Sequence, residues 1–498
     1  MSLKILLIKP HYNASEKYSS AVFPLGLLSI ATSLKKRGYE PIIIDTTIYE
    51  NYWNKIESHI GDSVAVGITS MSAQVYSACK IAEFLRSRKP DVPIIWGGVH
   101  PTLYPEDTAK SPLVDIVVSG EGDETVIELL DCLQLKKSIH EVKGITYKNG
   151  RAIIKTPDRP LLSDIPTLDY SLLPEIEKYI WPDLYPFRKE KARCIDIHAG
   201  RGCIYKCTFC FENTAFKHRA KSADLLVSEI AGLKEKFNIE MVNIQDSDFF
   251  ANKARLIHFV DLMIERKIGV KWFSNCRSNY FNNNYINEEL LKRLEASGCI
   301  KLGIGAESGS DMMLERMKKK TTVGQLRKAI DMLNKTNIWL ALSFLIGMPD
   351  ETEDDMKKTL ELVLKINEES KNHYIIGPAY YRPYPGAEMF KRSVDYGFKP
   401  PKSLEEWGAA QKERFGYLPI EKFVWVSNKN LAKYIVNIVD FRHFKKHKRL
   451  LFLYNFFMNV IEFRFRKNVW CCLWEDKMLL LIRGIITFLR NRAILIRA

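Results

Sequence analysis

The stretch Cys194-Ile-Asp-Ile-His-Ala-Gly200-Arg-Gly-Cys203-Ile-Tyr-Lys-Cys207-Thr-Phe-Cys210 joins a short apolar run to a loop that carries three cysteines. The run Cys194 to His198 is typical of a strand, and the glycines that follow it are typical of a turn. The sequence therefore predicts a strand that leads directly into a cysteine-bearing loop.

A regular alternation of strands and helices begins at this stretch. The expected strands are Cys194 to His198, Met241 to Gln245, Lys271 to Ser274, Lys301 to Ala306, Leu340 to Ile346 and Tyr374 to Tyr381. Helical patterns lie between them, so six strand-and-helix units follow one another. Such a series predicts a partial (β/α)6 barrel that resembles a TIM barrel, with its chemistry in the loops after the strands.

A second alternating series occupies the first 135 residues. Its expected strands are Lys4 to Ile8, Pro41 to Asp45, Val64 to Thr69, Pro93 to Trp96 and Asp115 to Ser119. This pattern predicts an α/β fold with a doubly wound, Rossmann-like parallel sheet. A ligand site is expected in the loops Pro10 to Ser20, Thr69 to Met71, Gly97 to Pro101 and Gly120 to Asp123, which follow the strands.

The chain of 498 residues is too long for one hydrophobic core. Asn149-Gly150 predicts a hairpin, and four prolines between Pro157 and Pro174 indicate a connector. We therefore expect a first domain over residues 1–140, a hairpin and Pro-rich linker over 141–190, the barrel over 191–400, and a mainly helical C-terminal region with a basic amphipathic tail over 401–498.

The three cysteines predict a metal centre. The N-terminal apolar stretch is too short for a signal peptide, so a reducing, cytoplasmic location is expected, where clustered thiols are metal or catalytic groups. Cys203, Cys207 and Cys210 are expected to hold three irons of a [4Fe–4S] cluster and leave the fourth iron open. The alternative is a structural zinc site closed by Cys194 or His198.

Cys-x-x-x-Cys-x-aromatic-Cys after the first strand of a six-unit barrel resembles the signature of the radical S-adenosylmethionine enzymes. The first domain resembles the cobalamin-binding domain that precedes the barrel in one large subgroup. The matching motifs are Pro24-x-Gly26-Leu, Trp96-Gly-Gly-Val-His100-Pro-Thr, Ser119-Gly-Glu-Gly122-Asp-Glu, Asp246-x-Asp248, Gly305-x-Glu307-Ser-Gly309, Gly347-Met-Pro349-x-Glu351-Thr and Arg382-Pro-Tyr-Pro385-Gly. They occur in order over about residues 1 to 400.

The resemblance implies three cofactors: a [4Fe–4S] cluster, S-adenosylmethionine and cobalamin (vitamin B12). It also implies an external one-electron reductant such as flavodoxin or ferredoxin and a small-molecule or lipid-like substrate. The expected reaction cleaves S-adenosylmethionine to a 5′-deoxyadenosyl radical and methylates an unactivated carbon in a biosynthetic pathway. The alternative reaction is radical cyclisation, ring contraction or oxygenation of a lipid-like or natural-product substrate. A third hypothesis is a non-catalytic cobalamin or metal sensor.

The resemblance also implies roles for single residues at the strand ends. Arg277, Ser274, Glu307 and Ser308 are expected to bind the methionine carboxylate and ribose of S-adenosylmethionine, Phe209 and Tyr381 to flank the adenine, and Asp246 to lie in the same cofactor site. Thr69, Ser70, Gly97, Gly98, His100, Glu121 and Gly122, with Gly120, are expected around the cobalamin. Histidine-ligated cobalt is not expected, because the first domain lacks Asp-x-His-x-x-Gly. Cys276 and Tyr381 are candidate radical-handling residues, with packing as the alternative for each.

The formal charge of +15 is concentrated near the C-terminus. From Arg442 onward 13 Lys and Arg stand against three acidic residues, which accounts for +10 of it. No nucleic-acid motif accompanies this charge, so nucleic acid is not an expected partner. The apolar stretches Leu450 to Ile461 and Met478 to Leu489 are edged by basic residues, which is typical of helices that lie on an anionic membrane surface. Packing on the barrel is the alternative; peripheral contact with the inner face of the membrane is the hypothesis.

Overall fold

The computed structural model describes residues 3–12, 22–180, 192–212, 217–411, 420–439, 451–470, 474–475, 478 and 481. Most of the expected loop Pro10 to Ser20 therefore lies outside the described residues. So do the basic run from Arg442 to Arg449 and most of the stretch Met478 to Leu489.

The N-terminal domain is built on a seven-stranded sheet in the order β2-β1-β3-β4-β5-β6-β7. Its strands are β1 (Lys4–Lys9), β2 (Glu40–Asp45), β3 (Ser63–Thr69), β4 (Ile94–Gly97), β5 (Ile116–Val118), β6 (Ile145–Asn149) and β7 (Ala152–Lys155). The first five run parallel, as expected.

Helices cover both faces of this sheet, because side chains alternate between the faces of a strand. Ile5 and Leu7 of β1 face one apolar core, whereas Leu6 and Ile8 face the other. The helices are α1 (Leu25–Arg37), α2 (Tyr52–Ile60), α3 (Val75–Arg88), α4 (Val99–Leu103), α5 (Pro105–Lys110) and α6 (Gly122–Gln134). α1 and α6 contribute to the first core, and α2 and α3 contribute to the second. The doubly wound prediction is confirmed.

The hairpin at Asn149-Gly150 belongs to the first sheet and not to the connector. β6 pairs antiparallel with β5, and β7 pairs with β6. This pairing covers the edge of β5, which would otherwise present unpaired backbone groups to solvent.

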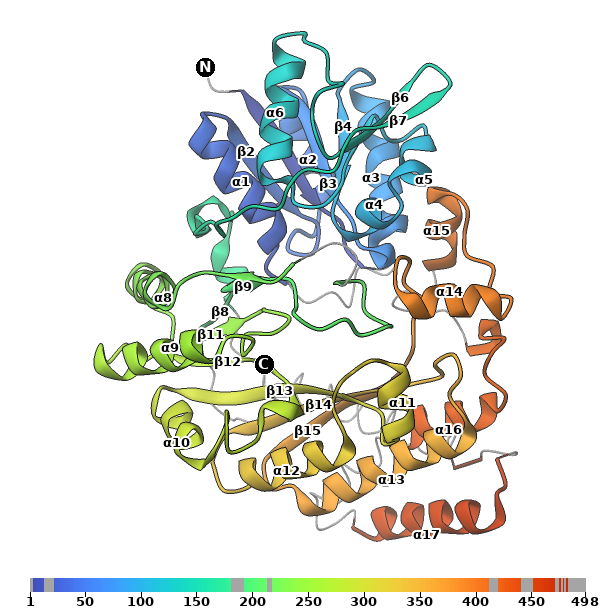
Figure 1. The fold of residues 1–498 in the computed structure, drawn as a ribbon. Coiled ribbons are helices and arrows are strands. Elements are labelled where there is room, and N and C mark those ends of the chain that lie inside the picture. Colours follow the sequence, from blue (N-terminus) through green and yellow to red (C-terminus); the bar gives the residue numbers. More distant parts are fainter. Residues whose placement is uncertain are drawn as a thin grey trace, which may run out of the picture.

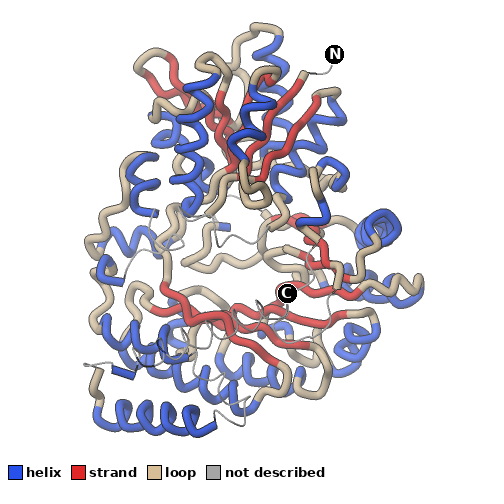
Figure 2. Tube along the Cα trace, turned by 180° about the vertical axis from the view of Figure 1, so that it is seen from behind, coloured by secondary structure: helices blue, strands red, loops and turns tan. Residues whose placement is uncertain are grey.

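The barrel sheet has six parallel strands in the order β8-β11-β12-β13-β14-β15, which follows the chain. They are β8 (Cys194–Ile197), β11 (Met241–Ile244), β12 (Lys271–Cys276), β13 (Cys299–Glu307), β14 (Trp339–Ile346) and β15 (His373–Tyr380). The helices that follow them are α8 (Ala223–Phe237), α9 (Lys253–Glu265), α10 (Glu288–Ala296), α11 (Asp311–Arg316), α12 (Val323–Leu333), α13 (Glu353–Glu369) and α14 (Glu388–Asp395). The partial barrel is confirmed; Figures 1 and 2 show it beside the N-terminal domain.

A short antiparallel pair lies between the first barrel strand and its helix. β9 (Gly200–Arg201) pairs with β10 (Arg219–Ala220), and Arg201 stands opposite Arg219. Gly202 follows with φ +76°, and a Cβ there would lie 2.6 Å from the carbonyl oxygen of Lys217. Only glycine fits this close approach, so the Arg-Gly-Cys sequence lets the chain turn into the cysteine loop.

The C-terminal region is helical, with α15 (Leu404–Gln411), α16 (Lys429–Ile438) and α17 (Leu451–Lys467). α15 returns to the N-terminal domain and packs on α3. Leu404 and Trp407 are buried in the same core as Val75 and Ala78 of α3. Among the described residues no helix is both long enough and apolar enough to cross a membrane.

Candidate active site

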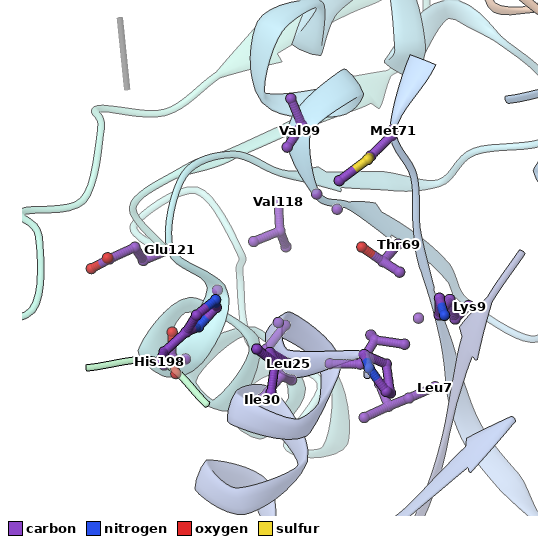
Figure 3. Close-up of a pocket in the computed structure, with 18 of the residues that line it drawn as sticks. Leu7, Lys9, Leu25, Ile30, Thr69, Met71, Val99, Val118, Glu121 and His198 are labelled. Carbon is purple, nitrogen blue, oxygen red and sulfur yellow. The ribbon is translucent and has the colours of Figure 1, made fainter. Parts of the chain in front are cut away.

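A cavity of about 490 Å³ lies between the two domains (Figure 3). One wall comes from the strand-end loops of the N-terminal domain, and the other comes from the first two strand ends of the barrel. Ligands of doubly wound sheets and of parallel barrels bind at such strand ends. Here both expected rims open into one shared space.

Most of the residues expected around the cobalamin line this cavity. They are Thr69, Gly97, Gly98, Gly120, Glu121 and Gly122. Gly98 has φ +94°, and a Cβ there would lie 2.7 Å from Oγ1 of Thr69 and 2.9 Å from the backbone nitrogen of Ser70. The loop therefore needs glycine at this position to keep its backbone close to the cavity.

Ser70 and His100 lie behind this loop and are not among the lining residues. The backbone nitrogen of Ser70 donates to Gly97, and its carbonyl oxygen accepts from the backbone nitrogen of His100. The imidazole of His100 pairs with Oγ of Ser72 at 3.1 Å and packs on Trp407. Burial lowers the pKa of His100 to about 3, so the ring is neutral and supports the loop from behind.

The barrel wall of the cavity is polar, and Asp196, His198, Gln245 and Ser247 line it. Asp196 accepts from Nδ2 of Asn243 at 2.8 Å and from Nε2 of Gln245 at 3.2 Å. Burial, with a smaller effect of nearby cations, lowers the pKa of His198 to about 4, which leaves a neutral ring facing the cavity. From the sequence, His198 was expected only as an alternative zinc ligand. Its position directly after a parallel strand was the signal that could have placed it at this rim.

The three cysteines of the loop after β8 are close enough to affect one another's pKa. Burial raises the pKa of Cys203 and raises that of Cys210 to about 11. Each sulfur has a donor nearby: the backbone nitrogen of Tyr205 lies 3.5 Å from Cys203 Sγ, Arg277 Nη1 lies 3.8 Å from Cys207 Sγ, and the backbone nitrogen of Glu212 interacts with Cys210. N–H donors around cysteine sulfurs are typical of iron–sulfur centres, so the loop fits a cluster.

The positions of Cys194 and His198, the two candidate fourth ligands, argue against the zinc alternative. Cys194 is buried at the start of β8 with Met241 and Phe273, at the opposite end of the strand from the loop. His198 faces the inter-domain cavity. Among the described residues no three His, Cys, Asp or Glu side chains are arranged to hold one metal ion. A four-iron cluster instead attaches each cysteine to a separate iron.

Arg277 ties the end of β12 to the cysteine loop. Its guanidinium lies 3.6 Å from the ring centroid of Tyr205, and its Nη2 donates to the carbonyl oxygen of Lys319. Its Nε is buried and has no hydrogen-bond partner among the described residues. A buried cation with an unused donor beside the cysteines matches the carboxylate-binding role predicted for Arg277, which stays a prediction.

Lys319 was not predicted from the sequence. Its Nζ forms a buried ion pair with Oε1 of Glu307 at 2.9 Å and lies 5.7 Å from the ring centroid of Phe209. Glu307 ends β13 with φ +62°. Lys319 thus joins two predicted S-adenosylmethionine-binding residues; it follows a helix and not a strand, so the strand-end rule gave no signal for it.

Asp246 and Ser274 hold neighbouring strand ends together. Oδ1 of Asp246 accepts from the backbone nitrogens of Ala199 and Gly200, both at 2.8 Å. Burial raises the pKa of Asp246 to about 6. The hydroxyl of Ser274 donates to the carbonyl oxygen of Ile244 at 2.9 Å. These contacts organise the rim, and direct cofactor contact by either residue stays a prediction.

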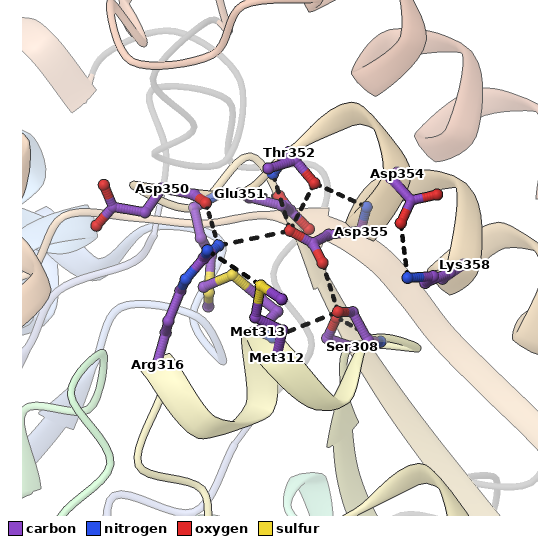
Figure 4. A network of polar contacts seen from close by, with 12 residues as sticks. Ser308, Met312, Met313, Arg316, Asp350, Glu351, Thr352, Asp354, Asp355 and Lys358 are labelled. Carbon is purple, nitrogen blue, oxygen red and sulfur yellow. Dashed lines mark hydrogen bonds and ion pairs between the residues drawn. The ribbon is translucent and has the colours of Figure 1, made fainter.

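Ser308 faces α13 (Figure 4). Its Oγ lies 3.2 Å from Oγ1 of Thr359 and accepts from the backbone nitrogen of Ser310. Asp355 accepts from the hydroxyl of Ser310 and also caps the start of α13 through Thr352. The two motifs around Ser308 and Thr352 therefore join the ends of β13 and β14 to α13, and a ribose contact from Ser308 stays a prediction.

The two candidate radical-handling residues are both buried. Cys276 donates to the carbonyl oxygen of Arg277 at 3.6 Å, and burial holds its pKa well above the ordinary value. Tyr381 is 1% exposed, and its ring centroid lies 6.3 Å from that of Trp425. Neither lines the inter-domain cavity. Their environments match the packing alternative, and a catalytic role for either stays a prediction.

Comparison with known proteins agrees with this geometry. Residues 197–363 match the Radical SAM superfamily model, and residues 15–130 match the B12 binding domain model. An uncharacterized methyltransferase of Pyrococcus horikoshii is 29% identical over 79% of this chain and 83% of its own length. The anaerobic magnesium-protoporphyrin IX monomethyl ester cyclase of Rubrivivax gelatinosus is 25% identical over 79% of this chain and 70% of its own.

The structure of the radical S-adenosylmethionine methyltransferase TsrM from Kitasatospora setae, solved with cobalamin and a [4Fe–4S] cluster, has the same fold. It superposes with a TM-score of 0.65 at 16% identity and covers 84% of this chain and 87% of TsrM. A cysteine-bearing partial barrel that shares a cavity with a B12-binding sheet defines a two-cofactor radical enzyme. The chain belongs to the cobalamin-dependent radical S-adenosylmethionine enzymes.

Proposed function

We propose that this enzyme transfers a methyl group to an unactivated carbon of a small molecule. The observation that carries the proposal is the shared cavity, in which Gly202 and Glu212, on either side of the three cysteines, line the same space as the strand-end loops of the B12-binding domain. A substrate held between the two walls meets both cofactors in one oriented complex. The methyltransferase name of the Pyrococcus relative supports the same reaction.

In this reaction the residues of the chain would bind the cofactors, orient the substrate and shield it from solvent. When bound, the cluster with S-adenosylmethionine supplies a hydrogen-abstracting radical, and cobalamin supplies the methyl group. Cys203, Cys207 and Cys210 would hold the cluster, and Arg277 would bind the methionine carboxylate. Gly97, Gly98 and Gly120 would let the backbone approach cobalamin closely, and apolar Leu7, Leu25 and Val118 line the same cavity.

The polar barrel wall would orient the substrate. Asp196 and Gln245 are linked to each other and face the cavity, and the neutral ring of His198 stands beside them. The external reductant, in our proposal a flavodoxin or ferredoxin, would deliver the electron that starts the cleavage. Radical cyclisation is the second candidate, because the Rubrivivax relative, which matches 79% of this chain, is a cyclase.

Isotope transfer tests the proposal. The reconstituted, reduced holoenzyme would be incubated with S-adenosylmethionine that carries a trideuteriomethyl group and with a metabolite extract from cells that lack this protein. Methyl transfer predicts a product that contains the labelled methyl group, and the Cys207→Ala variant should give none. Formation of 5′-deoxyadenosine with a hydrogen-depleted product and no labelled methyl would overturn methylation in favour of cyclisation.

We also propose that α17 contacts an anionic membrane surface. Phe452 and Phe463 of this helix are 67% and 57% exposed, whereas Phe457 and Ile461 are buried. The exposed side therefore carries large apolar rings, and Arg466 and Lys467 at its end are also exposed. Apolar rings edged by cations are what an interfacial helix presents to anionic headgroups.

A further inference from the structure

Four charged side chains meet at the boundary between the domains. Glu121 and Asp123 come from the start of α6, and Arg201 and Arg219 come from β9 and β10. Arg201 Nη1 lies 3.2 Å from Oε1 of Glu121 and 3.1 Å from Oδ2 of Asp123. The acidic side chains are only 6% and 7% exposed, and the arginines 15% and 16%.

The pairing of Glu121 with Arg219 is bidentate. Arg219 Nη1 lies 2.9 Å from Oε2, and Nη2 lies 2.7 Å from Oε1. Burial would raise the pKa of Glu121, but hydrogen bonding to Arg219 and the charge of Arg201 outweigh it and hold that pKa below its ordinary value. Forked Arg–carboxylate pairs fix direction as well as distance, so this contact sets an orientation between the domains.

The linker is part of the same cluster. The backbone nitrogen of Leu162 donates to Oε2 of Glu121 at 3.0 Å, and Arg219 Nη1 donates to the carbonyl oxygen of Leu162 at 2.6 Å. Asp123 accepts from the hydroxyl of Ser29 in α1, and Arg201 Nη2 donates to that hydroxyl at 2.8 Å. Both domains and the segment between them thus converge on one point.

The arginines stand opposite each other in the β9–β10 pair. Like charges directly across a strand pair are destabilising unless counter-charges are present. The acids are favoured where they lie, because Glu121 is the N-cap of α6 and Asp123 is in its first turn, at the positive end of the helix dipole. Each domain therefore carries two like charges that the other neutralises.

The cluster also connects the two cofactor loops. Glu121 stands between Gly120 and Gly122 in the lining of the cavity. Arg201 is separated from Cys203 only by Gly202, where the backbone of Lys217 and His218 approaches so closely that there is no room for a Cβ. Glu121 is thereby linked to the start of the cysteine loop by one ion pair and two residues of chain.

We propose that Glu121, Asp123, Arg201 and Arg219 form a positioning device that sets the cobalamin loop at a fixed place relative to the cluster loop. Glu121 thus binds the barrel arginines, and its role toward cobalamin is indirect. The inference rests on both cofactors binding at their loops, and not on methyl transfer being the reaction. Its test uses no substrate, so its failure is distinguishable from failure of the proposed function.

The test compares Arg219→Gln and Glu121→Gln with the wild-type holoenzyme. Arg193→Gln is the matched control, because Arg193 makes a bidentate pair with Glu177, 2.8 Å on both arms, beside the start of β8 and away from the cavity. Iron content and the melting temperature identify variants that fold and keep the cluster. Arg219→Lys retains the positive charge but cannot form the bidentate pair, and it is the milder variant if Arg219→Gln fails to fold.

Two measurements report on how the cobalamin is placed relative to the cluster. Relaxation enhancement of the cob(II)alamin EPR signal by the reduced cluster reports their separation, and equilibrium dialysis gives the cobalamin dissociation constant. We expect weaker, more heterogeneous enhancement and about a tenfold larger dissociation constant for Arg219→Gln and Glu121→Gln, a smaller change for Arg219→Lys, and none for Arg193→Gln. Wild-type enhancement together with a wild-type dissociation constant in folded Arg219→Gln or Arg219→Lys would overturn the proposal.

Hydrogen exchange tests the same coupling in the unaltered protein. Adding hydroxocobalamin to the cluster-loaded chain should slow amide exchange in β9 and β10 as well as in the loop at Gly120. Protection of the Gly120 loop with unchanged exchange in β9 and β10 would contradict a connection between the two cofactor loops.

Discussion

Nη1 of Arg277 lies 3.8 Å from Sγ of Cys207, so a cation from the end of the third barrel strand touches a cysteine of the loop after the first. The guanidinium is held in place by the ring of Tyr205 and by the carbonyl oxygen of Lys319. A fixed positive charge beside a cluster ligand stabilises the reduced, more negative form of the cluster.

Replacing Arg277 by Gln should therefore lower the reduction potential of the cluster. We expect a shift on the order of 60 mV, which corresponds to a tenfold change in a one-electron equilibrium. An EPR-monitored redox titration without S-adenosylmethionine measures this shift. The reduction potential of Arg277→Lys should lie between those of Arg277→Gln and the wild type. An unchanged potential would show that Arg277 does not act on the cluster electrostatically.

Alanine at Cys203, Cys207 or Cys210 should abolish the cluster. Each variant loses one of three protein ligands, so iron content and the visible absorption band after anaerobic reconstitution should fall nearly to background. Cys194→Ala is the matched control, because that thiol is buried at the other end of β8. Loss of metal from Cys194→Ala, or zinc in place of iron in the wild type, would revive the zinc site.

Gly98→Ala should damage the cobalamin site. The added Cβ would meet Thr69 and Ser70 at 2.7 to 3.0 Å in a backbone with φ +94°, so the loop must shift. We expect a loss of about 1–3 kcal/mol in stability and a cobalamin dissociation constant at least tenfold larger. Gly61→Ala, where the added atom meets nothing within 4 Å, is the control for glycine replacement. Equal effects of the two substitutions would argue against a special role for Gly98.

Asp246 should make stability fall as the pH rises. Burial raises its pKa to about 6 in the folded chain from 3.8, so the folded state favours the protonated form. This contribution, about 3 kcal/mol, is fully present below pH 4 and is lost as the pH rises through 6. Asp246→Asn mimics the protonated form and should be more stable than the wild type at pH 8, with the difference shrinking toward pH 4.

Urea unfolding of the cofactor-free protein between pH 4 and pH 8 measures that difference. Asp224→Asn is the control, because hydrogen bonding to His258 lowers the pKa of Asp224 below its ordinary value of 3.8. The contribution of Asp224 is lost only as the pH falls below about 4, so this variant should show little pH dependence between pH 4 and pH 8. A stability difference between Asp246→Asn and the wild type that does not vary with pH would contradict the assignment.

Replacing Phe452 and Phe463 together by Ser should weaken membrane binding. The wild type should float with phosphatidylglycerol vesicles and less with phosphatidylcholine vesicles, because cations accompany the exposed rings. Leu135→Ser, which alters a 64% exposed apolar side chain in the N-terminal domain, should float like the wild type. No flotation of the wild type would remove the proposal.

The architecture was predictable because the strands of both sheets, apart from the β6–β7 hairpin, run parallel and alternate with helices along the chain. Apolar runs such as Lys4 to Ile8 and Leu340 to Ile346 mark strands within a residue or two of their observed bounds. The hairpin of β6 and β7 was predicted, but its pairing with β5 was not. The sequence of a hairpin turn does not indicate which edge of which sheet the hairpin will join. α15 was missed as a part of the first domain because no local pattern encodes a contact with α3.

The candidate site was predictable in its cysteines and glycines and less so in its charges. Cysteine spacing and strand-end glycines are local signals. Which polar groups satisfy one another is decided by packing between distant segments. Glu121 and Ser308 illustrate this: one pairs with arginines of the barrel, and the other with Thr359 of α13.

Because Leu404 and Trp407 complete a core of the N-terminal domain, that core is complete only after these residues have left the ribosome. α15 is synthesised about 270 residues after the end of α6. At ~5–20 residues per second the nascent domain waits roughly 15–55 s with the apolar surface of α3 uncovered. Any form of the chain that ends before residue 404 would leave this apolar surface of α3 permanently exposed.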